Sequence, residues 1–173
     1  ANKGFSIRIV DYISFMITSF LASFLVRRVD IIVGTSPQFF TVVSAWMVAG
    51  FKSKPFVFEL RDIWPESIKA VGVMKNSLMV KLLEKFELFL YRRADAIISV
   101  TNSFKQNLID RKIPSRKIHV ITNGVDTSTF RNAPKPPKLL KKYKLEGKFV
   151  VGYIGTHGLA HALETILDAA NQM

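Results

Sequence analysis

The sequence contains no cysteine, which excludes disulfides, thiolate nucleophiles and cysteine-based metal sites and is compatible with a reducing compartment. Histidine is also scarce, with only His119, His157 and His161 present. His157 and His161 are four residues apart, but no glutamate stands between them in the metalloprotease pattern. We therefore expect neither a metal site nor a cofactor.

Long apolar runs are missing as well. The uncharged stretch 12–26 is shorter than the ~20 residues that cross a bilayer. Apolar residues recur in it at helical spacing, so we expect a helix over about 7–26 that is buried in the core. The alternative is a helix that dips into lipid headgroups, helped by Arg27 and Arg28. A signal peptide is disfavoured, since the run leads into Arg-Arg and a strand rather than a cleavage site.

Acidic residues are few, at 13 against 25 lysines and arginines, and the net charge is +12. This excess favours a phosphate-bearing partner, which could be a nucleotide substrate, an anionic lipid or a nucleic acid. No helix-turn-helix, RNA-recognition or zinc-finger pattern occurs, so nucleic acid is the least favoured of the three. Lysines and prolines gather at 131–148, a composition typical of a solvated linker.

Apolar, β-branched runs alternate with helix-length segments. The expected strands are 30–37, 56–60, 95–101 and 117–121, and the expected helices are 39–50, 77–93 and 103–111. Strands that are apolar throughout and alternate with helices predict an α/β fold, a Rossmann-like parallel sheet flanked by helices on both faces. A further strand at 149–154 and a helix at 160–170 start a new unit. A lone βα unit cannot form a complete sheet, so either the chain is a partial copy of a larger protein or this unit completes a sheet formed elsewhere.

Charged residues at the end of the expected strand 56–60 predict a ligand site. Arg61 and Asp62 follow this strand, and Glu59 and Trp64 flank them. Ligands of open α/β sheets bind outside the carboxyl ends of the strands. The alternative is a structural ion pair that caps a turn. Small polar residues end neighbouring strands, where they either cap turns and helices or face the same crevice: Thr35, Ser36, Thr101, Asn102 and Ser103.

Four segments resemble, in order, the family 4 glycosyltransferases of the GT-B fold. They are DIIVGTSPQF at 30–39, FELRDIWPES at 58–67, RRADAIISVTNSFKQNL with VITNGVDTSTF at 92–130, and VGYIGTHGLAHAL at 151–163. The nearest resemblance is to bacterial enzymes of surface-polysaccharide and O-antigen assembly, in the group of the N-acetyl-fucosaminyl transferase.

This resemblance implies two Rossmann-like domains around a cleft and a retaining transfer without an essential metal. Residues 1–130 would be the later part of the acceptor-binding domain, 131–148 the basic linker, and 149–173 the first βα unit of the nucleotide-sugar-binding domain. The family's motif of two glutamates separated by seven residues is missing. The first turn of the donor domain also lacks the Arg and Lys of many relatives.

The resemblance also implies roles for individual residues. The catalytic candidates are Asp62 and Arg61, and the acceptor-binding candidates are Thr35, Ser36, Glu59 and Trp64. The donor-binding candidates are Gly155, Thr156, His157 and Gly158, and the interdomain candidates are Asn123, Gly124 and Asp126.

The partners that follow are a nucleotide-sugar, which we expect to be UDP-linked, and a lipid-linked saccharide acceptor. The location would be cytoplasmic, with a peripheral position on an anionic inner membrane face. Two other functions stay open, a non-catalytic acceptor- or lipid-binding module and, less favoured, a basic nucleic-acid-binding domain.

Overall fold

The computed structural model describes residues 5–63, 78–158 and 161–172. The chain divides into two compact units, Ala1–Asn123 and Gly124–Met173, which are described separately.

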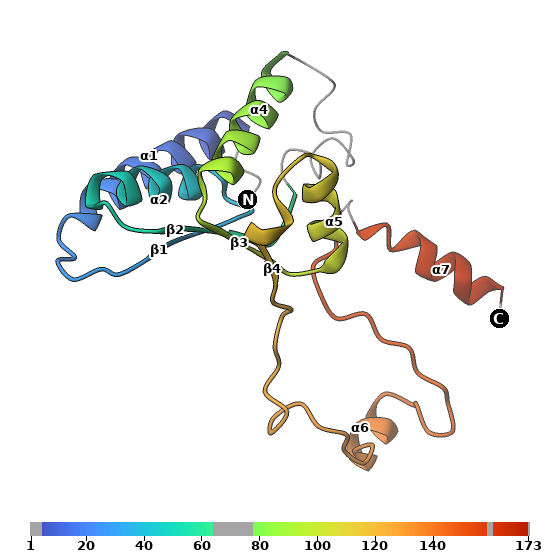
Figure 1. Cartoon of the computed structure of the whole chain (residues 1–173). Coiled ribbons are helices and arrows are strands. Elements are labelled where there is room, and N and C mark those ends of the chain that lie inside the picture. The colour runs from blue at the N-terminus through green and yellow to red at the C-terminus, as the bar shows by residue number, and fades with distance from the viewer. Residues whose placement is uncertain (1–4, 64–77, 159–160, 173) are drawn as a thin grey trace. The chain divides into compact units, whose positions relative to one another are not determined.

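The first unit contains a four-stranded parallel sheet (Figure 1). Its strands lie side by side in sequence order: β1 (Ile32–Thr35), β2 (Phe56–Leu60), β3 (Ala96–Ser99) and β4 (Ile118–Val120). The predicted parallel α/β sheet is therefore confirmed, and all four carboxyl ends lie at one edge.

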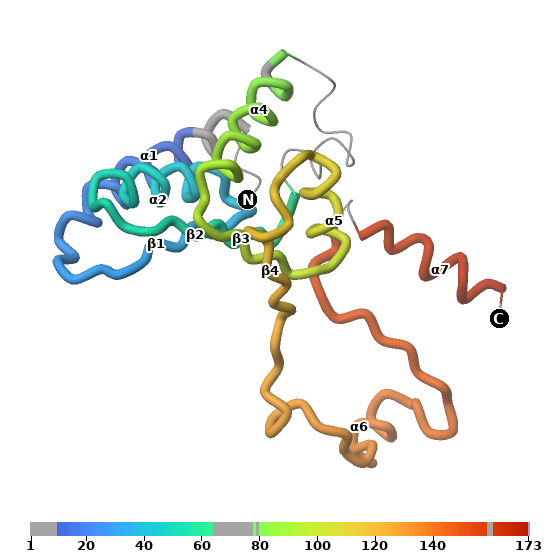
Figure 2. Tube along the Cα trace, in the orientation of Figure 1, coloured from blue at the N-terminus to red at the C-terminus, as the bar shows by residue number. Residues whose placement is uncertain are grey.

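The helices of this unit follow the predicted alternation, which can be traced along the chain in Figure 2. They are α1 (Phe5–Ser23), α2 (Phe39–Lys52), α4 (Leu78–Arg93), α5 (Asn102–Asp110) and the short 3₁₀ helix η1 (Ser115–Lys117). The N-cap of α5 is Thr101, whose hydroxyl accepts a hydrogen bond from the amide of Phe104, and not Ser103. Thr101 precedes the first residue with helical geometry, which is the position where a hydroxyl reaches the free amides.

The hydrophobic core lies on one face of the sheet. Phe58 of β2 packs its ring against Tyr91 of α4, with centroids 4.7 Å apart, and Ile97 is its buried neighbour on β3. On the opposite face Val33 is 51% exposed. Val57 on this opposite face is nevertheless buried. Among the described residues the helices that pack on the sheet lie on the Phe58 face, whereas the prediction had helices on both faces. Right-handed crossovers that step in one direction place their helices on the same face, which accounts for this.

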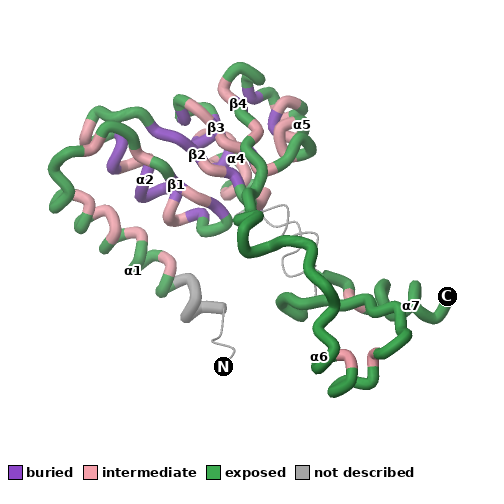
Figure 3. The backbone as a smooth tube through the Cα atoms, turned by 90° about the horizontal axis from the view of Figure 1, so that it is seen from below, coloured by how far each residue is buried: buried purple, intermediate pink, exposed green. Residues whose placement is uncertain are grey.

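Helix α1 is not the buried core helix that the sequence favoured. Its inner face packs on α2, where the hydroxyl oxygens of Ser19 and Ser44 lie 2.9 Å apart. Figure 3 shows no buried residue along its described part. The large apolar side chains Val10, Ile13, Ile17, Leu21 and Phe24 are exposed. Since α2 covers only one side of α1, the other apolar side stays open. No helix among the described residues is long and apolar enough to cross a membrane.

A buried ionic network joins α4 to α5. The carboxylate of Glu87 is 2% exposed, and it accepts hydrogen bonds from Tyr91 at 2.8 Å and from Arg111 at 2.7 Å. Burial raises the pKa of Glu87, and the charge and hydrogen bond of Arg111 oppose this rise. The pair therefore depends on both partners being present.

Gly34 marks the closest approach between β1 and α2. A Cβ atom at this position would lie 2.8 Å from the Cβ of Ala45 and 3.1 Å from the Cα of Val42. We expect Gly34→Ala to lower the free energy of unfolding by about 1–3 kcal/mol, since the backbone of α2 has to move. Urea unfolding of the chain measures this.

The control for this prediction is Gly50→Ala in α2. No atom lies within 4 Å of a Cβ at Gly50, and the residue is exposed. Alanine favours the helix over glycine by about 0.5–1 kcal/mol, so this variant should be slightly more stable. Equal effects of the two substitutions would contradict the close packing at Gly34.

The second unit contains α6 (Pro137–Lys142) and α7 (Glu164–Asn171). The strand predicted at 149–154 is wrong, because these residues have no strand geometry and are exposed. An apolar strand needs a neighbour for its backbone hydrogen bonds, and the second unit supplies none among its described residues. The helix expected from residue 160 begins at Glu164.

Candidate active site

The sequence-predicted site lies at the carboxyl edge of the sheet. Thr35 ends β1, Arg61 and Asp62 follow β2, and Asn123 follows β4. These residues are far apart in the sequence, and the parallel arrangement of the strands brings them to one edge. The carboxyl edge of a parallel sheet is the place where α/β proteins bind ligands.

Ser36 holds the turn that follows β2. Its side-chain oxygen accepts hydrogen bonds from the backbone amides of Arg61 at 2.9 Å and Asp62 at 3.3 Å, and its hydroxyl donates to the carbonyl of Asp62 at 3.2 Å. Ser36 is only 4% exposed. Its hydroxyl is thus used within the protein, and it positions the Arg61-Asp62 turn.

A second link joins the ends of β1 and β2. The hydroxyl of Thr35 donates to a carboxylate oxygen of Glu59 at 2.6 Å, and the two residues are register partners in the sheet. Glu59 is half-buried at this edge. The Thr35-Glu59 pair therefore presents an ordered carboxylate beside the Ser36 turn.

Arg61 and Asp62 do not pair with each other. The guanidinium of Arg61 donates to the side-chain oxygen of Asn123 at 3.2 Å, which connects the end of β2 to the end of β4. Among the described residues the carboxylate of Asp62 has no hydrogen-bond or ion-pair partner. Asp62 is half-buried, and with respect to the described residues its carboxylate is available to a bound hydroxyl group.

A depression of about 500 Å³ adjoins these residues. It is lined by α1 and by the segment that follows β1: Tyr12, Phe15, Thr35, Ser36, Pro37, Gln38 and Thr41. The sequence did not identify Tyr12, Phe15 or Gln38 as site residues. No short motif marks them, since Tyr12 and Phe15 come to the edge through the packing of α1 on α2.

The interdomain candidates divide between the two units. Asn123 belongs to the first unit and contacts Arg61, whereas Gly124 and Asp126 begin the second. The Asp126 carboxylate accepts hydrogen bonds from the side chain and the amide of Ser128 and from the side chain of Thr129, and these bonds lower its pKa. Asp126 is thus engaged in a local turn. Trp64 lies outside the described residues.

The donor-binding candidates lie in the second unit. The Tyr153 hydroxyl donates to the carbonyl of Thr156 at 3.0 Å, and its ring lies 5.8 Å from that of His157. A depression of about 580 Å³ is lined by Tyr153, His157, Gly158, Leu163, Glu164, Ile166 and Leu167. His157 and Gly158 therefore share a concave surface, and Gly155 and Thr156 lie beside it in the chain. Within the described ranges, no group of three or more acidic or histidine side chains could hold a metal ion.

A sheet of parallel strands with helices between them and polar side chains at the carboxyl edge defines a Rossmann-like α/β domain. Residues 6–129 match the sequence profile of Glycosyltransferase Family 4, and the chain belongs to this family. It is 24% identical over 148 residues to the "Probable glycosyltransferase WbjE" of Pseudomonas aeruginosa. This similarity covers 83% of the chain and 36% of that protein, so the chain spans about a third of the relative's length.

The Ser36 turn leads to a stability prediction. We expect Ser36→Ala to lower the free energy of unfolding by about 1–3 kcal/mol, because the amides of Arg61 and Asp62 lose their acceptor. Urea unfolding checks this value. The control is Ser23→Ala, whose hydroxyl bonds only the Phe20 carbonyl of its own helix. Its effect should stay within about 0.5 kcal/mol. Equal losses in both variants would contradict a positioning role for Ser36.

Proposed function

We propose that the protein transfers a sugar from a nucleotide-sugar donor to a saccharide acceptor with retention of the anomeric configuration. The observation that carries this proposal is the polar edge of the sheet, where Arg61 is fixed by Asn123 and the Asp62 carboxylate has no partner within the described ranges. Membership of glycosyltransferase family 4 supports it. The donor is proposed to be UDP-linked.

The chemistry needs two kinds of group. The leaving nucleotide diphosphate gains negative charge in the transition state, and preorganised donors lower its energy. We assign this role to the backbone amides of residues 155–158, and we propose that Arg61 orients Asp62. The acceptor hydroxyl loses a proton, and Asp62 is the carboxylate assigned to orient this hydroxyl and to accept its proton. Thr35 and Glu59 would hold further hydroxyl groups of the acceptor.

We further propose that the acceptor is a lipid-linked saccharide of bacterial surface-polysaccharide or O-antigen synthesis. The depression beside Thr35 is bordered by Tyr12 and Phe15 of α1, whose outer face exposes apolar side chains. Such a helix can lie in the headgroup region of a membrane. The protein would then work peripherally on the cytoplasmic face. We also propose that the protein belongs to the group of the N-acetyl-fucosaminyl transferase, on the basis of the four sequence segments that resemble this group.

The test uses the full-length protein that contains this chain. It is incubated with a panel of UDP- and dTDP-sugars and a polyprenyl-diphosphate saccharide, and product formation and nucleotide release are followed. We expect one donor to give a glycosylated acceptor with the donor's anomeric configuration, read by NMR. An inverted product, or nucleotide-sugar binding without transfer to any saccharide, would overturn the proposal.

A further inference from the structure

The side chain of Asn123 links the candidate active site to the point where the chain leaves the sheet. Strand β4 ends at Val120, and the amide of Ile121 still donates to the carbonyl of Ser99 at 2.9 Å. Asn123 follows two residues later and is the last residue of the first unit. Its side-chain oxygen accepts a hydrogen bond from Nη2 of Arg61 at 3.2 Å. Asn123 therefore holds a residue of the site from outside the strand that carries it.

The hydrogen bond between Arg61 and Asn123 crosses the end of a strand. Arg61 follows β2 and Asn123 follows β4, and β3 lies between these two strands in the sheet. A guanidinium carries donors and no acceptor, so the amide of Asn123 can meet it only through its oxygen. Both residues are exposed. Since an exposed hydrogen bond adds little to stability, its main effect is on where the long side chain of Arg61 lies.

Two separate contacts hold Arg61. The oxygen of Ser36 accepts the backbone amides of Arg61 and Asp62, which fixes the turn after β2 but leaves the Arg61 side chain free to rotate. Asn123 supplies the contact to the guanidinium. Within the described ranges, no other residue forms a hydrogen bond or ion pair with this guanidinium. The backbone of the turn is thus positioned from the end of β1 and the Arg61 side chain from the end of β4.

We propose that Asn123 is a positioning residue for sugar transfer. It fixes the place of the Arg61 guanidinium relative to Asp62, the carboxylate that Arg61 orients in the proposed mechanism. Without Asn123, the guanidinium can turn into solvent or close onto the neighbouring carboxylate of Asp62. In either case Asp62 is no longer presented correctly to the acceptor hydroxyl. This inference rests on the proposed function.

The first test measures sugar transfer by the full-length protein, with UDP-sugars as donors and a polyprenyl-diphosphate saccharide as acceptor. Asn123→Ala should lower kcat by about 10- to 100-fold, the cost of a misplaced reacting group, and leave the acceptor KM within about threefold. Asn123→Asp keeps an oxygen in the same place and should return kcat to within about threefold of the unchanged protein. A role confined to maintaining the fold would not give this division between kcat and KM or this rescue.

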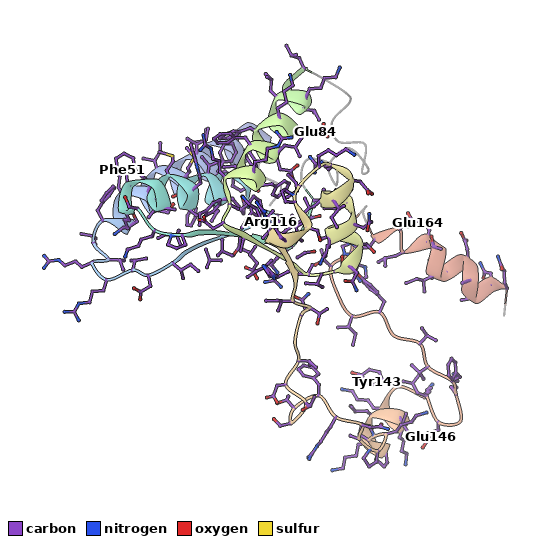
Figure 4. The ribbon with its side chains drawn as sticks, in the orientation of Figure 1. Phe51, Glu84, Arg116, Tyr143, Glu146 and Glu164 are labelled. Atoms are coloured by element: carbon purple, nitrogen blue, oxygen red, sulfur yellow. The ribbon has the colours of Figure 1, made fainter. Side chains whose placement is uncertain are left out.

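A double-variant cycle tests whether Asn123 acts through Arg61. If it does, Arg61→Ala/Asn123→Ala should have a kcat within about twofold of that of Arg61→Ala, because the partner is already gone. The matched controls are Asn132→Ala and Arg116→Ala, which change exposed residues outside the site. Arg116 lies on η1, which leads into the amino end of β4 (Figure 4). Both controls should keep kcat within about twofold of the unchanged protein.

A second readout does not depend on activity. The order parameter of the Nε–H bond of Arg61 is measured by ¹⁵N relaxation in the 173-residue chain. We expect it to fall below about 0.6, the range of flexible groups, in Asn123→Ala and to stay unchanged in Asn132→Ala. An equally ordered Arg61 side chain in Asn123→Ala would show that another contact positions it and would overturn the inference.

The kinetic results separate this inference from the proposed function. If Asp62→Ala abolishes transfer but Asn123→Ala keeps the full kcat, the positioning role is wrong and the proposed function stands. Losses that multiply in Arg61→Ala/Asn123→Ala would also overturn the inference, since Asn123 would then act independently of Arg61. If the unchanged protein transfers sugar to no saccharide, the proposed function fails and the positioning role fails with it.

Discussion

Asp62→Ala in the full-length protein is expected to lower turnover by about 10²- to 10⁴-fold, the range over which a positioned proton-transfer group contributes. The Asp62 carboxylate lies at the carboxyl edge of the sheet and has no partner among the described residues. Its backbone amide and carbonyl, which bond to Ser36, are kept in the variant. The free energy of unfolding should therefore change by less than about 0.5 kcal/mol. Initial rates of sugar transfer and urea unfolding measure the two quantities.

The matched control is Asp30→Ala. Asp30 is exposed and precedes β1, so it lies at the amino edge of the same sheet. We expect full activity in this variant. Asp62→Asn separates charge from hydrogen bonding, since the amide can orient a hydroxyl but cannot take its proton. Near-normal turnover in Asp62→Ala would remove Asp62 from the proposed mechanism.

Glu87→Ala is expected to lower the free energy of unfolding by about 3–5 kcal/mol. The substitution leaves the guanidinium of Arg111 without the carboxylate that it meets at 2.7 Å, and it removes the acceptor of the Tyr91 hydroxyl. The guanidinium keeps only the more distant carboxylate of Glu84, at 3.8 Å, and a poorly compensated charge held between α4 and α5 costs more than the pair contributes. Urea unfolding followed by circular dichroism gives the value.

Two comparisons make this prediction specific. Glu84→Ala should cost less than about 1 kcal/mol, because Glu84 lies 3.8 Å from Arg111 and its side chain is 40% exposed. Glu87→Leu/Arg111→Met should recover much of the loss, since no unpaired charge remains. If the double variant is as unstable as Glu87→Ala, the loss does not come from the unpaired guanidinium.

The contribution of Glu87 to the free energy of unfolding depends on pH with a defined sign. Burial raises the pKa of Glu87, so the folded state binds its proton more tightly than the unfolded state. The stability that Glu87 contributes is therefore fully present below its unfolded pKa and declines as the pH rises through the folded pKa. The difference in the free energy of unfolding between the unchanged chain and Glu87→Gln should therefore shrink as the pH rises from the unfolded pKa of Glu87 to its folded pKa.

Local patterns were sufficient for the secondary structure of the first unit. The apolar runs at Phe56–Leu60 and Phe39–Lys52 are bounded by turn residues, and they form the expected strand and helix. The same reasoning failed at 149–154, where an equally apolar run forms no strand. A strand depends on hydrogen bonds to a neighbour, and no local pattern can show whether that neighbour is present.

The candidate site was likewise predictable from the sequence only in part. The Arg61-Asp62 pair at a strand end predicted a site at the carboxyl edge, because ligands of open α/β sheets bind outside the carboxyl ends of the strands. The sequence did not show that Arg61 donates a hydrogen bond to Asn123, 62 positions away in the chain. It also did not show that Ser36 is buried and that its hydroxyl is hydrogen-bonded to the Arg61-Asp62 turn. These contacts depend on the order of the strands.

The sequence by itself determined the alternation of strands and helices, the family, the excess of positive charge and the strand ends that carry the candidate site. Each of these is a property of neighbouring residues or of composition. Only the tertiary structure decided which face of the sheet carries the core, that α1 exposes its outer apolar side, and that Arg61 bonds Asn123 while the Asp62 carboxylate has no partner among the described residues. These follow from contacts between distant segments, whose free energies depend on the geometry of the whole fold.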